Sequence, residues 1–435
     1  MVNFTKALLG ASTLISTASA FPAFVDGEWE KFDFENFDKA IDPIFKRIDQ
    51  ESWNKIAAIE KRQQATFNED AQRVDVSGEH EYKPPTDGQT RGPCPGLNIL
   101  SNHGYFDRSG NTNLIESIDA LTNVLGMGTD TALALVAYSI AIIGDPIALT
   151  WSIGASPGKE VLLPGVLSPP GGIDQSHNAY ESDASITRSD SYLANGDVWS
   201  SNTTRFEHLY NLLDDNDPNA NFNLDVINKQ RAWTHDESVY HNPNFFYAPF
   251  AGLVVASAAH NFVPVFFSNH SAEHPEGYLD HYNLKTFFGY TGNSKDGLVY
   301  HYGQERIPDN WYKRTDPYTL VDVVTDVLGN IAYHPQAGTV GGNLGEVNTF
   351  TGVDLGNLTG GVFNAANLLE GNNLFCFAFA AGRAGLPSVL GGAASIVGQA
   401  LGFLDEKLGP LLAGLSCPQL DQLNLDVFNQ FPGYG

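Results

Sequence analysis

The chain of 435 residues is short of positive charge. It has 24 lysines and arginines against 50 aspartates and glutamates, which gives a formal net charge of −26. This balance argues against nucleic acid or an anionic membrane as a partner. Beyond the N-terminus the chain also lacks the roughly 18 consecutive apolar residues of a membrane span. It has no nucleophile elbow and no zinc signature, so a hydrolase that uses Glu181 and Asp183 as catalytic carboxylates is a weak hypothesis.

Cysteine is scarce as well, with three residues in the whole chain, Cys94, Cys376 and Cys417. Cys94 stands between Pro93 and Pro95, and a proline is well suited to the first position of a helix. Cys94 would then be the N-cap, and the free amides of Gly96, Leu97 and Asn98 together with the helix dipole would favour its thiolate. A stabilised thiolate suits an axial haem ligand. A lone cysteine is more commonly a buried core residue, and local chemistry does not decide between these readings.

Residues 1–20 have the pattern of a secretory signal peptide. Lys6 supplies a basic start, an apolar stretch follows, and Ala18-Ser19-Ala20 is a small-residue cleavage site. Glycosylation acceptors begin at Asn202, Asn269 and Asn357, although such triplets are frequent by chance. We therefore predict a secreted, soluble glycoprotein.

The remaining pattern predicts a mainly α protein. A hydrophobic content of 42% is enough for a substantial core. Residues 21–77 form a charge-rich amphipathic segment, a possible propeptide with a dibasic pair at Lys61-Arg62, which is equally typical of a solvated helix end. Helix-spaced apolar residues follow at 114–125, and 130–143 predicts a more buried helix. Residues 151–172 are rich in glycine and proline and predict a loop.

Four segments in order resemble the fungal haem-thiolate peroxidases, the chloroperoxidase and unspecific peroxygenase family. They are RGPCPGLNILSNHGYFDRSG at 91–110, SHNAYESDASITRSD at 176–190, the stretch from Asn242-Pro243 into GLVVASAAHNFVPVFF, and GQERIPDNWYKR at 303–314. The resemblance implies one large helical haem-binding domain over residues 78–320, with irregular loops. It implies an extension at 321–435 packed on that domain, and a late disulfide between Cys376 and Cys417. Pairing of Cys94 with either of these would remove the haem ligand.

The resemblance also implies the cofactors and their ligands. Cys94 would be the axial ligand of the iron of haem b. Glu181, the backbone carbonyl of Ser182 and the hydroxyl of Ser185 would hold a magnesium ion beside a haem propionate. Oxygen ligands suit this hard cation. Outside such a context, Glu-x-Asp-x-Ser is most often a helix cap.

The third segment departs from the family at two functional positions. The family has an arginine and, seven residues later, a glutamate over the haem, and an ungapped reading places Leu253 and His260 there. A neutral imidazole can carry the peroxide proton as the glutamate does, so His260 is the candidate acid–base residue. The alternatives are a buried core histidine with catalysis lost or moved, or a carboxylate from Glu273 or Glu276.

The resemblance implies a secreted peroxidase or peroxygenase. Such an enzyme uses hydrogen peroxide, through a ferryl-oxo intermediate, to oxidise or oxygenate a small apolar or aromatic substrate. Phe245, Phe246, Tyr247 and Phe250 are candidates for an access channel, although aromatic residues at this spacing are more often core. Two alternatives are a non-catalytic secreted haem- or ligand-binding glycoprotein and a haem-thiolate oxidase dedicated to a secondary-metabolite pathway. Beyond Val321 the chain predicts irregular surface structure, followed by apolar helices at 374–381 and 386–415. The sequence does not indicate an oligomeric state.

Overall fold

The computed structural model describes residues 67–145, 148–156, 171–364, 367, 368, 370, 373–389, 417, 418, 420 and 423–434. The predicted signal peptide, Lys61-Arg62 and most of the amphipathic segment lie outside the described residues. The described chain is mainly helical, which confirms the predicted fold class. Its α-helices are α4 Glu69–Gln72, α5 Pro95–Asn102, α6 Leu114–Asn123, α7 Thr129–Ile143, α8 Thr203–Tyr210, α9 Leu224–His241, α10 Ser257–Phe267, α11 His281–Phe288, α12 Leu320–Tyr333, α13 Leu355–Leu358 and α14 Asn373–Val389.

Other helical turns and short strands connect these helices. The 3₁₀ turns are η3 Gly78–His80, η4 Ile173–Gln175, η6 Pro335–Gly338 and η7 Leu425–Phe428, and η5 Ala251–Ala256 is a π-helix. The strands are β1 Asn111–Asn113, β2 Thr150–Ser152, β3 Phe246–Tyr247, β4 Tyr290–Asn293, β5 Gly297–Tyr300, β6 Gly341–Gly342 and β7 Thr351–Gly352. They pair antiparallel as β1–β2, β3–β6–β7 and β4–β5. No described helix has the length and apolar character needed to cross a membrane.

Helix α5 begins as the sequence predicts, with Cys94 at the N-cap and Pro95 in the first turn. The side chains of Asn98 and Asn102 fix the helix to the loops on either side. Asn98 exchanges hydrogen bonds with the backbone of Gly92, at 3.0 and 2.9 Å. Asn102 Nδ2 donates to the carbonyl oxygens of Gly303 and Glu305, at 2.8 and 2.7 Å. The helix that presents Cys94 is therefore held by buried polar contacts as well as by apolar packing.

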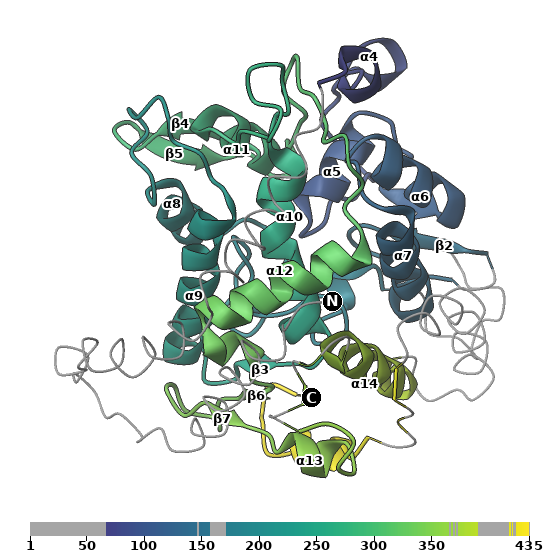
Figure 1. Ribbon diagram of the computed structural model, residues 1–435, viewed down its shortest axis with the longest axis vertical. Helices are drawn as coiled ribbons and strands as arrows, with labels where there is room; N and C mark the ends of the chain where they lie inside the picture. Colours follow the sequence, from purple (N-terminus) through teal and green to yellow (C-terminus); the bar gives the residue numbers. More distant parts are fainter. Residues whose placement is uncertain are drawn as a thin grey trace, which may run out of the picture.

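Helices α6 and α7 confirm the predictions at 114–125 and 130–143. Asn113 caps α6 by accepting hydrogen bonds from the amides of Ile115 and Glu116. Apolar residues cover most of α7, so this helix is buried on nearly all sides. The two helices pack side by side, and strands β1 and β2 pair next to them (Figure 1).

Helix α10 runs through the middle of the fold between α9 and α12 (Figure 1). The segment η5 immediately precedes α10. It is a π-helix, because the amides of Leu253 and Val255 donate to the carbonyls five residues earlier, those of Ala248 and Phe250. Pro264 lies inside α10 and has no N–H to donate to the preceding turn. Short π-helical segments inside helices are frequent at functional sites.

The C-terminal part differs from the prediction at its start. Residues 320–333 form α12, which packs against α7, α9 and α10, although irregular structure was expected beyond Val321. Thr319 and Asp322 form a capping box, in which each side chain accepts a hydrogen bond from the other residue's backbone amide. This box marks the start of a helix, but the glycine-rich sequence that follows favoured a prediction of irregular structure. Cys376 of α14 forms a disulfide with Cys417, and Cys94 is free, which confirms the expected pairing. Most of the predicted helix 386–415 lies outside the described residues.

His103, which ends α5, makes the fold sensitive to acid. The Ile307 amide donates to His103 Nε2 at 3.1 Å, so that nitrogen must be unprotonated, while Nδ1 donates to the His80 carbonyl at 2.7 Å. Burial lowers the pKa of His103 from 6.5 to about 4. Because the pKa is lower in the folded state, the contribution of His103 to stability is complete above pH 6.5 and is lost as the pH falls toward 4.

We expect the free energy of unfolding of His103→Gln to fall less than that of the wild type as the pH decreases from 6.5 toward 4. The wild type should lose roughly 2–3 kcal/mol more than the variant between pH 7 and 4.5, from about 1.4 kcal/mol per pKa unit. Urea unfolding at the two pH values measures this difference. His241→Gln is the control, because His241 is exposed on α9. Parallel pH profiles for wild type and His103→Gln would contradict the assignment.

Candidate active site

The loop of Cys94 opens onto a cavity of about 210 Å³ between α5, α7, η5 and α10. Most of its walls are apolar, and aromatic side chains contribute much of the surface. Its lining includes Tyr138, Trp151, Tyr180, Phe250, Phe262, Phe266, Phe267 and Phe379. The ionisable side chains among the described lining residues are Cys94, Tyr138, Tyr180 and Glu181. The cavity therefore offers a sulfur ligand, one carboxylate and a large apolar surface.

The environment of Cys94 differs in one respect from the prediction. Its sulfur accepts no capping hydrogen bond of full geometry, and the amides of Leu97 and Asn98 donate to the Cys94 carbonyl, at 3.2 and 3.1 Å, although the amides of Gly96 and Leu97 still act on the sulfur. Burial raises the pKa of the Cys94 thiol, while the backbone amides of Leu97 and Gly96 and the charge of Arg188 oppose this effect. The helix start alone therefore does not lower the pKa of this thiol below its ordinary value.

A buried ion pair supports the Cys94 loop from behind. Arg188 Nε donates to the Pro93 carbonyl at 2.8 Å, and Arg188 Nη2 lies 3.3 Å from Glu305 Oε1. Asn98 Nδ2 of α5 donates to the same carboxylate oxygen at 3.0 Å. Arg188 thus joins the loop before α5 to the segment 303–314. The sequence analysis assigned no role to Arg188 or Glu305. Both lie inside segments that resemble the family, and this was the only sequence feature that could have pointed to them.

The three residues predicted to bind magnesium lie together at the cavity wall. Glu181, Ser182 and Ser185 all line it. Glu181 Oε1 is buried without a hydrogen-bond partner, while Oε2 accepts from His177 Nδ1 at 2.8 Å. Burial lowers the pKa of His177, but its hydrogen bond with Glu181 and the charge of Asp183 outweigh burial and raise the pKa to about 9. One carboxylate oxygen therefore remains available to a cation.

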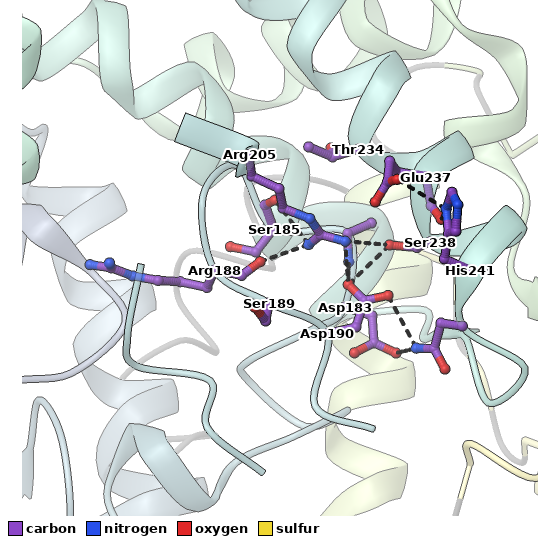
Figure 2. Close-up of polar contacts among 12 residues, drawn as sticks. Asp183, Ser185, Arg188, Ser189, Asp190, Arg205, Thr234, Glu237, Ser238 and His241 are labelled. Carbon is purple, nitrogen blue, oxygen red and sulfur yellow. Dashed lines mark hydrogen bonds and ion pairs between the residues drawn. The ribbon is translucent and has the colours of Figure 1, made fainter. Parts of the chain in front are cut away.

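A network of buried polar side chains holds this loop in shape (Figure 2). Asp190 Oδ1 accepts from Arg205 Nη2 at 2.8 Å and from Ser238 Oγ at 3.0 Å. Arg205 Nη1 donates to the carbonyl of Arg188 at 2.7 Å. Asn242 Nδ2 bridges Asp183 and Asp190, at 3.0 and 3.1 Å. The loop from 181 to 190 is thus tied to α8 through Arg205 and to α9 through Ser238.

The pKa values of Asp183 and Asp190, the two aspartates that Asn242 bridges, are shifted in opposite directions. Burial and the charge of Asp190 raise the pKa of Asp183 to about 8. For Asp190, the charge of Arg205 and the hydrogen bond from the Ala184 amide outweigh burial and lower its pKa. Asp190 is therefore the anion that balances Arg205, while burial and the charge of Asp190 work against the charged form of Asp183.

The structure does not bring His260 to the cavity. The ring is fully buried on the side of α10 that faces α9, with Nδ1 2.7 Å from the Ala256 carbonyl and Nε2 3.3 Å from Thr234 Oγ1. Burial and the charges of Arg231 and Arg205 lower its pKa well below 6.5. The expectation that this ring lies over the haem stays a prediction, and the ring is not among the residues that line the cavity. Sequence spacing gives a position along a helix but not the face that tertiary packing turns inward.

Other candidates near this helix are also absent from the cavity lining. Leu253, at the position of the family's arginine, is buried elsewhere, and Glu273 and Glu276 are exposed. The cavity is lined instead by Val255 of η5 and by Ala259 and Phe262 of α10.

The predicted aromatic channel is mostly core. Phe245, Phe246 and Tyr247 are buried and do not line the cavity, whereas Phe250 does. Phe250 stacks on Tyr138 of α7, with ring centroids 4.1 Å apart. Phe379 of α14 meets the same tyrosine edge to face, with centroids 5.8 Å apart. The C-terminal extension thus supplies part of the cavity wall, a role that sequence reasoning did not foresee.

Comparison with known proteins gives consistent matches. A family model described as peroxidase, family 2, matches residues 80–316. Aromatic peroxidase fscJ of Fusarium equiseti is 40% identical over 392 residues, which cover 87% of this chain and 88% of that protein. Dothistromin biosynthesis peroxidase dotB of Dothistroma septosporum is 37% identical over 381 residues, 86% of this chain and 89% of that protein. Aromatic peroxygenase of Cyclocybe aegerita is 30% identical over 278 residues, 62% of this chain and 66% of that protein.

These matches cover the Cys94 loop, the loop at 181–190 and α10 in one continuous region. The family model alone spans more than half of the chain, and two relatives extend the similarity to most of its length. The chain therefore belongs to peroxidase family 2, the fungal haem-thiolate peroxidases and peroxygenases, and is a peroxide-dependent oxidoreductase.

Proposed function

We propose that the protein is a secreted haem-thiolate enzyme that uses hydrogen peroxide to oxidise or oxygenate a small aromatic compound. The observation that carries this proposal is the position of Cys94, a free cysteine at a helix N-terminus whose loop opens into a large apolar cavity. When bound, the haem supplies the redox chemistry by which peroxide oxidises the substrate.

The residues around the cavity fit haem b. An apolar pocket matches the porphyrin face, and a sulfur at its wall is a suitable axial ligand. Cys94 would hold the iron through Sγ, and its loop is kept in place by the Arg188–Glu305 pair. The guanidinium of Arg188 also favours the thiolate form of Cys94. The apolar walls keep water from the reacting groups.

The same cavity wall fits a magnesium ion. Glu181 Oε1, the Ser182 carbonyl and Ser185 Oγ are hard oxygen donors, and the unpartnered buried oxygen of Glu181 supports this assignment. We propose that these three groups hold magnesium next to a propionate, and that His177 orients the Glu181 carboxylate through its hydrogen bond to Oε2.

A more specific candidate is oxidation of a dedicated aromatic intermediate of a secondary-metabolite pathway. The relative from Dothistroma septosporum is named as a biosynthetic peroxidase and matches 86% of the chain, whereas the aromatic peroxygenase of Cyclocybe aegerita matches 62%. Part of the C-terminal extension lines the cavity through Phe379. A wall contributed by this extension would restrict the cavity to one substrate shape. Secretion rests on the signal-like residues 1–20, and the Cys376–Cys417 disulfide is consistent with it.

Two measurements on the purified protein test the proposal. The ferrous–carbon monoxide complex should show the Soret position of a thiolate-ligated haem. Peroxide should be consumed with an aromatic co-substrate. A thiolate spectrum without peroxide turnover would point to a non-catalytic haem-binding protein, and the absence of haem would overturn the proposal.

We expect Glu181→Gln to lower the bound magnesium from about one ion per haem. An amide oxygen lacks the negative charge that a hard cation prefers, so affinity should fall by roughly a hundredfold or more, beyond the 10–100-fold cost of losing a partner of a metal ligand. Metal analysis after dialysis measures this change. Glu273→Gln is the control, because Glu273 is exposed and outside the cavity. A wild-type protein with full haem and no divalent ion would contradict the assignment.

We expect His260→Ala to leave peroxide activation within a few-fold of the wild type. The ring faces α9 and both nitrogens are occupied, so it is not placed to exchange a proton with a group in the cavity. Stopped-flow kinetics with peroxide across pH measures this effect. Loss of roughly two or more orders of magnitude would restore His260 as the acid–base residue. In that case we would expect His260→Glu to recover activity.

A further inference from the structure

A second group of metal-binding side chains lies where the middle of α9 meets the end of α12. It consists of His235 and Asp236 on α9 and His334, the residue that ends α12. One ligand atom from each of the three residues lies within 4.8 Å of the other two. None of the three lines the cavity of Cys94, and they share no residue with the Glu181 loop.

The distances in this cluster suit one cation between three ligands. His334 Nε2 lies 3.1 Å from Asp236 Oδ1, and His235 Nδ1 lies 3.5 Å from the same oxygen. Nitrogen and oxygen ligands about 2.0–2.2 Å from a tetrahedral zinc ion are separated by roughly 3.3–3.5 Å. Three protein ligands would leave a fourth position for water.

Hydrogen bonding does not account well for the same contacts. His334 Nε2 is buried and has no hydrogen-bond partner, despite lying close to Asp236. The contact of His235 is at the outer limit of a hydrogen bond, and its Nε2 is also buried without a partner. The buried His334 nitrogen beside Asp236 therefore lacks a partner, which is costly, and a cation between His334 and Asp236 would supply one.

The charge and accessibility of the cluster also suit a cation. The side chain of His235 is only 1% exposed, and its Nδ1 lies 3.5 Å from the Asp236 carboxylate. Asp236 supplies the negative charge, and with 43% of its side chain exposed it leaves an entry path from solvent. Rings of Phe245, Tyr247 and Phe350 surround His235 and fix its orientation.

We propose that His235, Asp236 and His334 form a binding site for a divalent transition cation, with Zn²⁺ as the best match. Two imidazoles and one carboxylate are borderline ligands that favour Zn²⁺ and its neighbours over Mg²⁺ or Ca²⁺. The ion would join α9 to the end of α12 and so hold together two helices that flank α10. Binding of the ion at this site does not depend on the cavity reaction.

Zinc binding to the purified, haem-loaded protein tests the site. After chelation and dialysis, the protein is equilibrated with micromolar ZnCl₂ in excess MgCl₂, which occupies a magnesium site at Glu181. We expect one zinc per chain in the wild type and a rise in melting temperature with zinc concentration. Asp236→Asn and His334→Gln should each weaken zinc binding by about a hundredfold or more.

His241→Gln is the matched control, because His241 is an exposed residue on the same helix and pairs with one carboxylate, that of the partly buried Glu237, at 3.0 Å. It should bind zinc as the wild type does. The haem spectrum reports whether each variant is folded, and anomalous diffraction at the zinc edge locates the ion in the wild type. Less than stoichiometric zinc in the wild type, or equal binding by Asp236→Asn, would overturn the proposal.

Discussion

Cys94→Ser should remove the thiolate signature of the ferrous–carbon monoxide spectrum and nearly abolish peroxide turnover. Cys94 is the free cysteine of the described chain, and its loop lies at the cavity wall. A serine hydroxyl stays protonated at neutral pH and cannot donate electron density as a thiolate does. We expect activity to fall by about a hundredfold or more, beyond the roughly 10–100-fold effect of losing a partner of a metal ligand.

Two further variants keep this expectation interpretable. Cys94→His would provide an alternative axial ligand and retain haem with a different spectrum, which separates loss of the thiolate from loss of the haem. Cys376→Ser breaks the disulfide and should keep the thiolate spectrum, because that bond lies in the extension. A thiolate spectrum that persists in Cys94→Ser would assign the iron to another ligand.

Asp190→Ala should be among the most destabilising single substitutions in the described chain. Asp190 is fully buried and balances the charge of Arg205, whose side chain is 3% exposed (Figure 2). Its removal leaves a buried guanidinium without a counter-charge, which costs about 3–5 kcal/mol. It also releases Ser238 Oγ and the Ala184 amide from their shared acceptor. Chemical denaturation of wild type and variant measures the difference.

The loop at 181–190 should respond together with the stability. Arg205 donates a hydrogen bond to the carbonyl of Arg188. Arg188 and Asp190 lie in the same loop as the proposed magnesium ligands, Glu181 to Ser185. We therefore expect the folded fraction of Asp190→Ala to bind less magnesium. Asp190→Asn, which keeps the shape but not the charge, should lie between wild type and alanine. Glu69→Ala is the control, because Glu69 and Arg73 are more than half exposed and their pair contributes at most about 1 kcal/mol.

The sequence by itself determined the family, the mainly helical fold and the identity of the cysteine at the helix start. These features depend on local chemistry that is readable in order along the chain. Pro95 sets the first turn of α5 beside Cys94, and apolar spacing defines α6 and α7. The Cys376–Cys417 pairing was expected from the resemblance, and the structure has it.

Tertiary structure alone decided which side chains meet. His260 occupies the expected place along α10, but packing turns it toward Thr234 of α9. Arg188 and Glu305 are 117 residues apart, and only folding reveals that they form a buried pair behind Cys94. His334 approaches His235 and Asp236 because α12 ends against α9. Rotation of a helix about its axis and contacts between distant segments depend on the whole core, and no local pattern in the chain specifies them.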